Sequence, residues 1–234
     1  AAITGAGLTK YNIHGEDAAL AGALSALRGK HPGAPVILVP GQVEDDASIR
    51  LGATGKVRTN RGLLEITRAG NPQAIVLYKP HPDVEAGLRP GAVPDAATLA
   101  DLVIERTDAA TLLSLVDEVW TLTSGLGFEA LLRGKPVTCL GAPFYAGWGL
   151  THDLGPVPAR RQTEPGSPRP DLATLVHATL IAYPRYLDPL TNKPCPPELL
   201  IERLAQGQTR APRPALRLLA KIQGALASHA RLWR

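Results

Sequence analysis

Short runs of mainly apolar residues are the dominant pattern in the middle of this chain. Each is followed at once by glycine, proline or polar residues, and they occupy positions 36–39, 75–78, 118–122 and 136–140. Runs of this length are typical of parallel strands that are covered on both faces. Between them, apolar residues recur at helical spacing over 61–69 and 109–116. The alternation predicts an α/β fold with a Rossmann-like, mainly parallel sheet.

The flanking regions have other patterns. Helical spacing predicts further helices at 16–28 and 172–182, whereas 184–197 is expected to run irregularly over the surface. Beyond a break rich in Gly, Gln and Pro at 206–214, the residues to 234 can form a basic amphipathic helix.

Three of the predicted strands end in polar residues, and the end of the third is the most informative. Thr123, Ser124 and Gly125 follow it and open a helix that contains Glu129. Backbone N–H groups and the helix dipole can bind a phosphate at such a turn, and Glu129 is placed to reach ribose hydroxyls. The alternative is structural: a hydroxyl that caps the helix and a carboxylate that complements its dipole.

The strand at 75–78 runs directly into Lys79, Pro80, His81 and Pro82. Ligands of parallel sheets bind beyond the carboxyl ends of the strands, where these residues would lie. The prolines restrict the backbone on either side of His81. His81 is therefore a candidate donor to a phosphate or a leaving oxygen, with Lys79 as the cation. A solvated proline turn is the alternative.

The strand at 36–39 leads into three consecutive acids, Glu44, Asp45 and Asp46. Clustered carboxylates repel one another unless a cation or a donor network intervenes, and such clusters occur where a carboxylate acts as nucleophile or base. A solvated loop or a helix N-cap is the alternative for Asp45 and Asp46. Metal binding is less favoured, because no His or Cys cluster accompanies the acids.

A loop of aromatic residues and glycines, from Phe144 to Gly149, follows the strand at 136–140. Its flat rings can form a lid over a sugar or a base, or can close the core at a domain edge. Further on, Arg160 and Arg161 are expected to form an exposed basic pair at the start of an exposed loop at 160–170.

Together these segments carry a family resemblance. Gln-Val-Glu-Asp-Asp-Ala-Ser, Lys-Pro-His-Pro-Asp, Thr-Ser-Gly-Leu-Gly-Phe-Glu-Ala-Leu-Leu-Arg-Gly-Lys-Pro, Pro-Phe-Tyr-Ala-Gly-Trp-Gly-Leu-Thr and Ile-Ala-Tyr-Pro-Arg-Tyr-Leu-Asp-Pro begin at positions 42, 79, 123, 143 and 181. They resemble the capsule polysaccharide β-Kdo transferases of the KpsC type, over about 8–204. The resemblance implies a retaining GT-B glycosyltransferase without cofactor or metal. It would move 3-deoxy-manno-octulosonic acid (Kdo) from CMP-Kdo to a lipid-linked saccharide acceptor in capsule biosynthesis and export.

The resemblance also implies roles for individual residues. Asp46 is the candidate nucleophile, and Gln42 and Ser48 would orient it or the sugar carboxylate. His81 is the second catalytic candidate, at the phosphate that leaves with CMP. Retention of configuration is compatible with a covalent glycosyl intermediate or with front-side attack.

The other candidates would hold the donor. A His-Pro pair and a Ser/Thr pair would bind the phosphate, a lysine would neutralise its charge, and a glutamate would bind the ribose. These residues are Lys79, Pro82, Thr123, Ser124, Gly125 and Glu129.

One departure from the family pattern affects the expected organisation. The family carries a Glu-Asp-Gly motif, followed by an aromatic or aliphatic residue and Arg-Ser, upstream of the matched part, and this chain has neither that motif nor any Met. We therefore expect a partial chain: a helical lead-in from an absent lobe at 1–33, a Rossmann-like nucleotide-sugar-binding domain at 34–205, and a basic amphipathic tail at 206–234.

Composition narrows the remaining possibilities. The chain is 44% hydrophobic and 20% charged, as expected of a globular domain, and its net charge is +4. Acids and bases are mixed and no nucleic-acid motif is present, so we expect no nucleic-acid partner. Without an apolar run of membrane-spanning length or a signal peptide, a cytoplasmic protein is expected, peripheral at the inner face of the cytoplasmic membrane. Cys139 and Cys195 are expected to be free thiols.

Two other functions stay open at this point. One is a non-catalytic CMP-sugar-binding or assembly module of a larger capsule protein, which would bind CMP without turnover. The other is a GT-B transferase that uses a different nucleotide sugar, which competition among CMP, UDP and GDP would identify. The expected partners are CMP-Kdo, the lipid-linked acceptor and other capsule assembly proteins.

Overall fold

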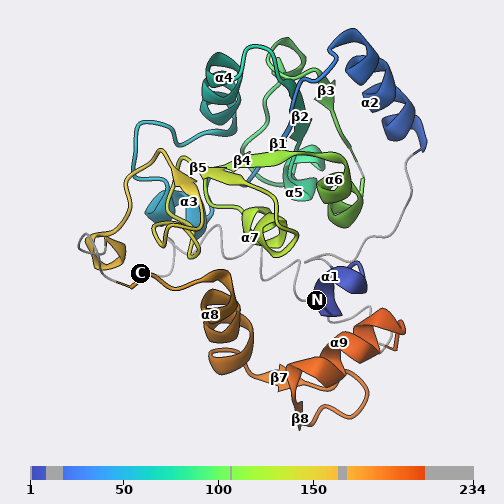
Figure 1. Cartoon of the computed structure of the whole chain (residues 1–234), viewed down its shortest axis with the longest axis vertical. Coiled ribbons are helices and arrows are strands. Elements are labelled where there is room, and N and C mark those ends of the chain that lie inside the picture. The colour runs from blue at the N-terminus through green and yellow to red at the C-terminus, as the bar shows by residue number, and fades with distance from the viewer. Residues whose placement is uncertain (1, 9–17, 106, 163–167, 209–234) are drawn as a thin grey trace. The chain divides into compact units, whose positions relative to one another are not determined.

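A computed structural model describes residues 2–8, 18–105, 107–162 and 168–208 of the chain (Figure 1). The described residues divide into two compact units, one within 3–184 and the other within 185–208. The expected basic tail falls almost entirely on 209–234, outside the described residues. In the part of the chain that is described, no helix is both long and apolar enough to cross a membrane.

The first unit alternates strands with helices, as the apolar pattern predicts. Its strands are β1 (Val36–Pro40), β2 (Ile75–Lys79), β3 (Leu102–Val103), β4 (Glu118–Thr121), β5 (Val137–Cys139) and β6 (His152–Asp153). Its helices are α1 (Ala2–Gly5), α2 (Ala18–Lys30), α3 (Ala47–Gly52), α4 (Asn60–Gly70), α5 (Pro82–Glu85), α6 (Ala109–Leu115), α7 (Gly125–Leu132) and α8 (Leu172–Val176). A π-helical segment, His177–Ala182, continues α8, and 3-10 turns lie at Ala96–Thr98 and Ala159–Arg161.

The six strands form one parallel sheet in the order β3-β2-β1-β4-β5-β6. This is the Rossmann order, in which the chain first builds outward from β1 and then returns to its other side. β1 therefore lies between β2 and β4, and Leu38 pairs with Leu77 on one side and Val119 on the other. The loops that leave β1 and β4 diverge to opposite faces, which opens a crevice at the carboxyl edge.

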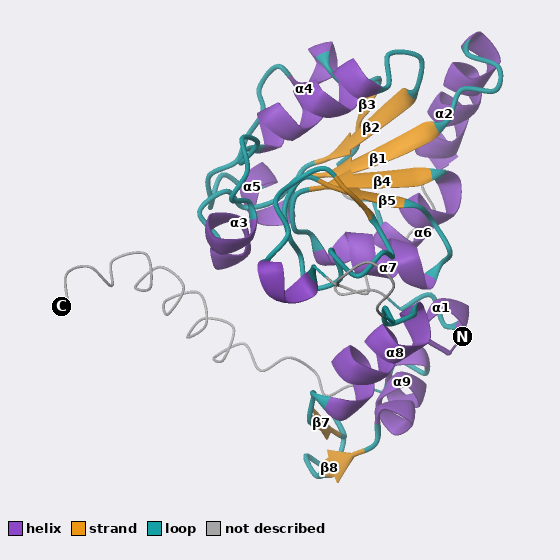
Figure 2. Ribbon diagram, turned by 60° about the vertical axis from the view of Figure 1, so that its left-hand side comes forward, coloured by secondary structure: helices purple, strands orange, loops and turns teal. Residues whose placement is uncertain are grey.

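Two apolar layers cover the sheet, because successive side chains of each strand point to opposite faces. Val36 and Leu38 belong to the layer that packs on α2, α6 and α7. Ile37 and Val39 belong to the layer that packs on α3 and α4. Figure 2 shows α4 on one face of the strands and α6 and α7 on the other. The expected α/β fold with a mainly parallel sheet is confirmed.

The second unit is small. Its described part has an antiparallel pair, β7 (Tyr186–Leu187) and β8 (Pro194–Cys195), followed by α9 (Pro197–Ala205). The irregular course predicted for 184–197 thus misses a short β-hairpin, which two-residue strands do not reveal as a pattern. Both cysteines are free; Cys139 is buried in β5 and Cys195 lies in β8.

The expectation for Arg161 is wrong. Only 9% of its surface is exposed, and its guanidinium donates to the carbonyl oxygens of Pro143 and Ala146. It also lies 5.8 Å from the ring centroid of Trp148. A guanidinium has five N–H donors and can bond to several carbonyl oxygens at once. Arg161 therefore anchors the aromatic loop and is not exposed to solvent.

Candidate functional site

A cavity of about 510 Å³ opens at the carboxyl edge of the sheet, where the strand order reverses. All ten candidate residues line it: Gln42, Asp46, Ser48, Lys79, His81, Pro82, Thr123, Ser124, Gly125 and Glu129. They belong to three segments, at and after the ends of β1, β2 and β4, which are neighbours in the sheet but lie far apart in sequence. The sheet topology therefore brings together what the sequence pattern indicated separately.

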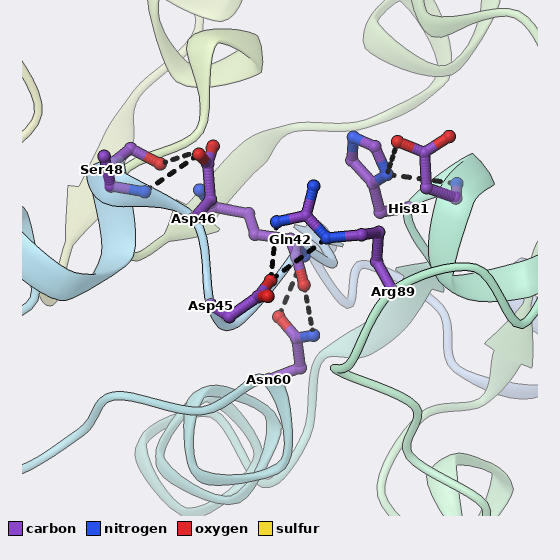
Figure 3. Close-up of polar contacts among 9 residues, drawn as sticks. Gln42, Asp45, Asp46, Ser48, Asn60, His81 and Arg89 are labelled. Carbon is purple, nitrogen blue, oxygen red and sulfur yellow. Dashed lines mark hydrogen bonds and ion pairs between the residues drawn. The ribbon is translucent and has the colours of Figure 1, made fainter. Parts of the chain in front are cut away.

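The three acids after β1 have different partners. Glu44 accepts from the backbone N–H of Asn60 at 2.7 Å. Asp45 pairs with Arg89 at 2.7 Å (Figure 3). Asp46 caps α3: its carboxylate accepts from the N–H of Ala47 at 2.8 Å and from the hydroxyl of Ser48 at 3.2 Å. The Arg89 guanidinium and three N–H or O–H donors thus bind the three carboxylates separately and reduce the repulsion between them. Asp46 is a helix cap and, at the same time, an exposed carboxylate on the cavity wall.

Gln42 bridges the loops after β1 and β4. The N–H of Thr123 can only donate, so the Gln42 oxygen that lies 2.9 Å from it is fixed as the acceptor. The Gln42 amide nitrogen then faces the hydroxyl oxygen of Thr123, at 2.9 Å, and donates to it. The side chain of Gln42 therefore orients the Thr123 turn, and its hydrogen-bond partners among the described residues are Thr121 and Thr123, not Asp46.

A residue that sequence reasoning missed holds Gln42 in place. Asn60, 1% exposed at the start of α4, accepts from the backbone N–H of Gln42 at 2.9 Å. Its amide nitrogen donates to the carbonyl oxygens of Gln42, at 2.7 Å, and Gly91, at 2.8 Å. Figure 3 shows Asn60 below Gln42, with its amide group directed toward Gln42. The polar start of a surface helix gave no signal that this side chain would be buried.

The turn after β4 presents donors to the cavity. Ser124 caps α7 because its hydroxyl oxygen accepts from the N–H of Leu126 at 3.2 Å, and Thr123 accepts from Gln42. A hydroxyl that accepts still has its proton to donate, and no described residue accepts from either one. The backbone N–H groups of Thr123, Ser124, Leu126 and Gly127 donate within the protein. That of Gly125, on the cavity wall, has no partner among the described residues.

His81 ends the loop after β2 and caps α5. Its Nδ1 accepts from the N–H of Asp83 at 3.2 Å, so the neutral ring carries its proton on Nε2. The Asp83 carboxylate lies 3.9 Å from the same Nδ1. The ring lines the cavity together with Pro82.

Lys79 supplies positive charge on this wall. Burial lowers the pKa of its ammonium group, and the nearby carboxylates of Glu85 and Asp108 oppose that effect. Both acids line the cavity, as does half-buried Glu129 on α7. Sequence reasoning missed Glu85, Thr107 and Asp108, which follow β2 and β3 and belong to no motif that it used.

The distribution of groups defines the chemistry that this cavity can perform. Hydroxyl protons, a backbone N–H and a half-buried ammonium converge where β1, β2 and β4 end, and such a set favours a phosphate. An exposed carboxylate, Asp46, lies on the β1 side of the same cavity. Anion binding and carboxylate chemistry are thus combined in one site. In the described residues, no three His, Cys, Asp or Glu side chains could together hold a metal ion.

Comparisons with known proteins agree on one family. The family model described as "Capsule polysaccharide biosynthesis protein" matches residues 1–186. The capsule polysaccharide modification protein LipA of Neisseria meningitidis serogroup A is 54% identical over 160 residues, which are 68% of this chain and 22% of LipA. The lipopolysaccharide-processing protein LpsZ of Rhizobium meliloti is 44% identical over 186 residues, 79% of this chain and 39% of LpsZ.

Solved structures give the same picture. KpsC of Thermosulfurimonas dismutans, a beta Kdo 2,7 transferase, superposes with a TM-score of 0.65 at 35% identity, over 88% of this chain and 65% of that one. The beta Kdo 2,4 transferase of the same KpsC superposes with a TM-score of 0.63 at 31% identity, over 82% of this chain and 64% of that chain. The chain spans less than two thirds of each of these relatives. The matches confirm the expectation of a partial chain relative to them.

Proposed function

This chain belongs to the capsule polysaccharide biosynthesis protein family, and from that premise we propose that its cavity binds the nucleotide end of CMP-Kdo. The function proposed is that of the donor-binding half of a retaining glycosyltransferase of GT-B architecture. Kdo would pass from CMP-Kdo to a lipid-linked saccharide in capsule biosynthesis. The similarity to Kdo transferases of known structure supports a glycosyltransferase.

The presence of several donors on the wall of one cavity at the sheet edge carries this proposal. The hydroxyls of Thr123 and Ser124 and the N–H of Gly125 would bind the phosphate, with Lys79 as the countercharge. As the bond between Kdo and CMP breaks, negative charge grows on the phosphate, so these groups stabilise the leaving group. His81 would donate its ring proton to the same oxygen atoms.

The remaining roles follow from position. Glu129 would accept from the ribose hydroxyls, since it lines the cavity on α7 beyond the Ser124 turn. Asp46 would attack the anomeric carbon of Kdo and form a glycosyl ester as CMP leaves, and the acceptor hydroxyl would then displace the carboxylate. Two inversions give retention. Front-side attack, in which Asp46 only stabilises positive charge on the sugar, is the other route.

Calorimetric titration with CMP tests the proposed site. The unmodified chain should bind CMP, and UDP or GDP should not displace it. His81→Ala and Ser124→Ala should each weaken binding by about ten-fold, since each removes a donor to a charged group. Because Ser124 is also a helix cap, Asp171→Ala serves as the control: it removes a cap on α8, outside the cavity, and should leave the affinity unchanged.

The possible results separate the competing functions. CMP binding with no sugar transfer would favour the non-catalytic CMP-sugar-binding module. Displacement of CMP by UDP or GDP would favour a transferase for another nucleotide sugar. If the unmodified chain does not bind CMP, the proposal is wrong for this chain.

The lowered pKa of Lys79 predicts a pH dependence. CMP is a dianion above about pH 7, so its own charge does not change on further alkalinisation. Lys79 loses its proton below the usual lysine range, because burial disfavours the charged form. CMP affinity should therefore fall as the pH rises from 7 to 10, by about ten-fold overall. Lys79→Arg should remove most of this dependence, and a flat profile for the unmodified chain would contradict the assignment.

The setting of the site is also a proposal. Residues 34–205 would form the nucleotide-sugar-binding domain, residues 1–33 the lead-in from a preceding lobe, and residues 206–234 a basic tail. The +4 net charge is suited to a peripheral position at the anionic inner face of the cytoplasmic membrane, close to a lipid-linked acceptor and other capsule assembly proteins. Binding to anionic vesicles, compared with neutral ones, would test that position.

A further inference from the structure

The hydroxyl of Tyr145 lies behind the Ser124 turn and has no role in the function proposed above. Tyr145 is fully buried, and its hydroxyl lies 2.5 Å from the carbonyl oxygen of Ser124. A carbonyl can only accept, so the tyrosine donates. The same carbonyl also accepts from the N–H of Gly127, at 3.1 Å. The position of this one oxygen is therefore set from two sides.

The peptide geometry connects this contact to the cavity. The carbonyl of Ser124 and the N–H of Gly125 belong to one planar, trans peptide unit, so they point in opposite directions. A hydrogen bond that fixes the carbonyl on the buried side also fixes the N–H on the other side. Gly125 lines the cavity, open space adjoins its Cα, and its N–H donates to no other described residue.

We propose that Tyr145 is a positioning residue for phosphate binding: it holds the Ser124–Gly125 peptide so that the Gly125 N–H points into the cavity. The inference rests on the proposed function for the identity of the ligand. Hydrogen bonding at the carbonyl also polarises the peptide unit, which makes its N–H a better donor.

The surroundings of Tyr145 are built for this contact. Its ring stacks on Phe128, with centroids 6.2 Å apart, and meets Phe144 edge-on at 5.2 Å. A Cβ at Gly127 would lie 2.1 Å from the hydroxyl, so glycine leaves the space that this hydroxyl occupies. Burial raises the pKa of the Tyr145 phenol well above its usual range, and the group remains a donor at any working pH. The aromatic loop thus closes the core through Tyr145, while Phe144 is 44% exposed.

Tyr145→Phe tests the proposal, because it removes the hydroxyl and keeps the ring. We expect CMP to bind about five-fold more weakly, the usual effect of losing one hydrogen bond. Cytidine has no phosphate, so its affinity should not change. Gly127→Ala, which displaces the hydroxyl without removing it, should produce the same phosphate-dependent loss.

Tyr78→Phe is the matched control. Tyr78 is 1% exposed, its hydroxyl has no hydrogen-bond partner among the described residues, and it does not line the cavity. CMP affinity should therefore be unchanged. Equal weakening of CMP and cytidine in Tyr145→Phe would mean general damage to the site and would overturn the proposal. Unchanged CMP binding in that variant would overturn it as well.

A second readout does not depend on the ligand. The amide proton resonance of Gly125 should shift in Tyr145→Phe and not in Tyr78→Phe, because only the first loses the bond to the Ser124 carbonyl. If the unmodified chain binds neither CMP nor cytidine, the proposed function fails, and the resonance alone decides the role of Tyr145. An unshifted Gly125 resonance would overturn that role.

Discussion

Asp46→Asn is expected to abolish Kdo transfer, by on the order of 10³-fold or more, while CMP affinity and the fold are retained. An asparagine oxygen can still accept from the N–H of Ala47, as the Asp46 carboxylate does at 2.8 Å, so the cap of α3 is kept. The amide is not a nucleophile and carries no charge. The substitution thus separates the chemical role of Asp46 from its structural one.

The neighbouring acid provides the control for this experiment. Asp45→Asn removes one carboxylate from the same loop, but this carboxylate is half-exposed and pairs with Arg89, also half-exposed. Such pairs contribute about 0–1 kcal/mol, so stability and transfer should change little. Equal loss of transfer in both variants would indicate a requirement for loop charge and not for a nucleophile.

Mass spectrometry distinguishes the two retaining routes. In the covalent route, the peptide that contains Asp46 should carry a Kdo adduct, and Asp46→Ala should not form it. An adduct that persists in Asp46→Ala would exclude Asp46 as the nucleophile. Transfer that requires Asp46 but leaves no adduct would favour front-side attack.

Asn60→Ala is expected to have the largest effect on stability, a decrease of about 3 kcal/mol in the free energy of unfolding. The substitution leaves the N–H and carbonyl of Gln42 and the carbonyl of Gly91 without their bonds to Asn60. Unsatisfied buried polar groups are costly, and the site is 1% exposed. Urea denaturation, followed by far-UV circular dichroism, measures the change in midpoint.

A second asparagine tests whether burial of the network is the cause. Asn71, at the end of α4, makes one side-chain bond, to the carbonyl of Thr67 at 3.0 Å, and is only partly buried. Asn71→Ala should cost less than about 1 kcal/mol. Asn60→Ala should also weaken CMP binding at temperatures where it remains folded, because Gln42 would no longer hold the Thr123 turn. If Asn60→Ala lowered the free energy of unfolding as little as Asn71→Ala does, the buried hydrogen bonds of Asn60 would not have the stabilising role assigned to them.

Several residues that sequence reasoning selected have two roles at once. Asp46 and Ser124 were each open to a binding interpretation and a helix-cap interpretation, whereas the alternative for His81 was a solvated proline turn. All three are caps, and all three line the cavity. The two interpretations are compatible because a cap residue stands where a strand loop enters a helix, and in a parallel sheet these entrances form the carboxyl edge. Their roles in catalysis remain predictions.

The sequence by itself determined the elements that repeat a local pattern. The runs at 36–39 and 75–78 appear as β1 and β2, and the helical spacing at 61–69 appears as α4, because period and turn residues are local properties. The motifs after β1, β2 and β4 indicated the residues that line the cavity. Some short elements, such as β3, β6 and α3, were missed, because two residues of strand or six of helix do not establish a period.

Only the tertiary structure decided which partner each polar side chain has. Gln42 bonds to Thr123, 81 residues away, because β1 and β4 are neighbours in the sheet. The burial of Asn60 and Arg161 and the contact of Tyr145 with Ser124 depend on how helices and loops pack over that edge. Hydrophobic periodicity shows which face of an element is buried. Strand order and packing determine what lies opposite that face, and neither is encoded in any single segment.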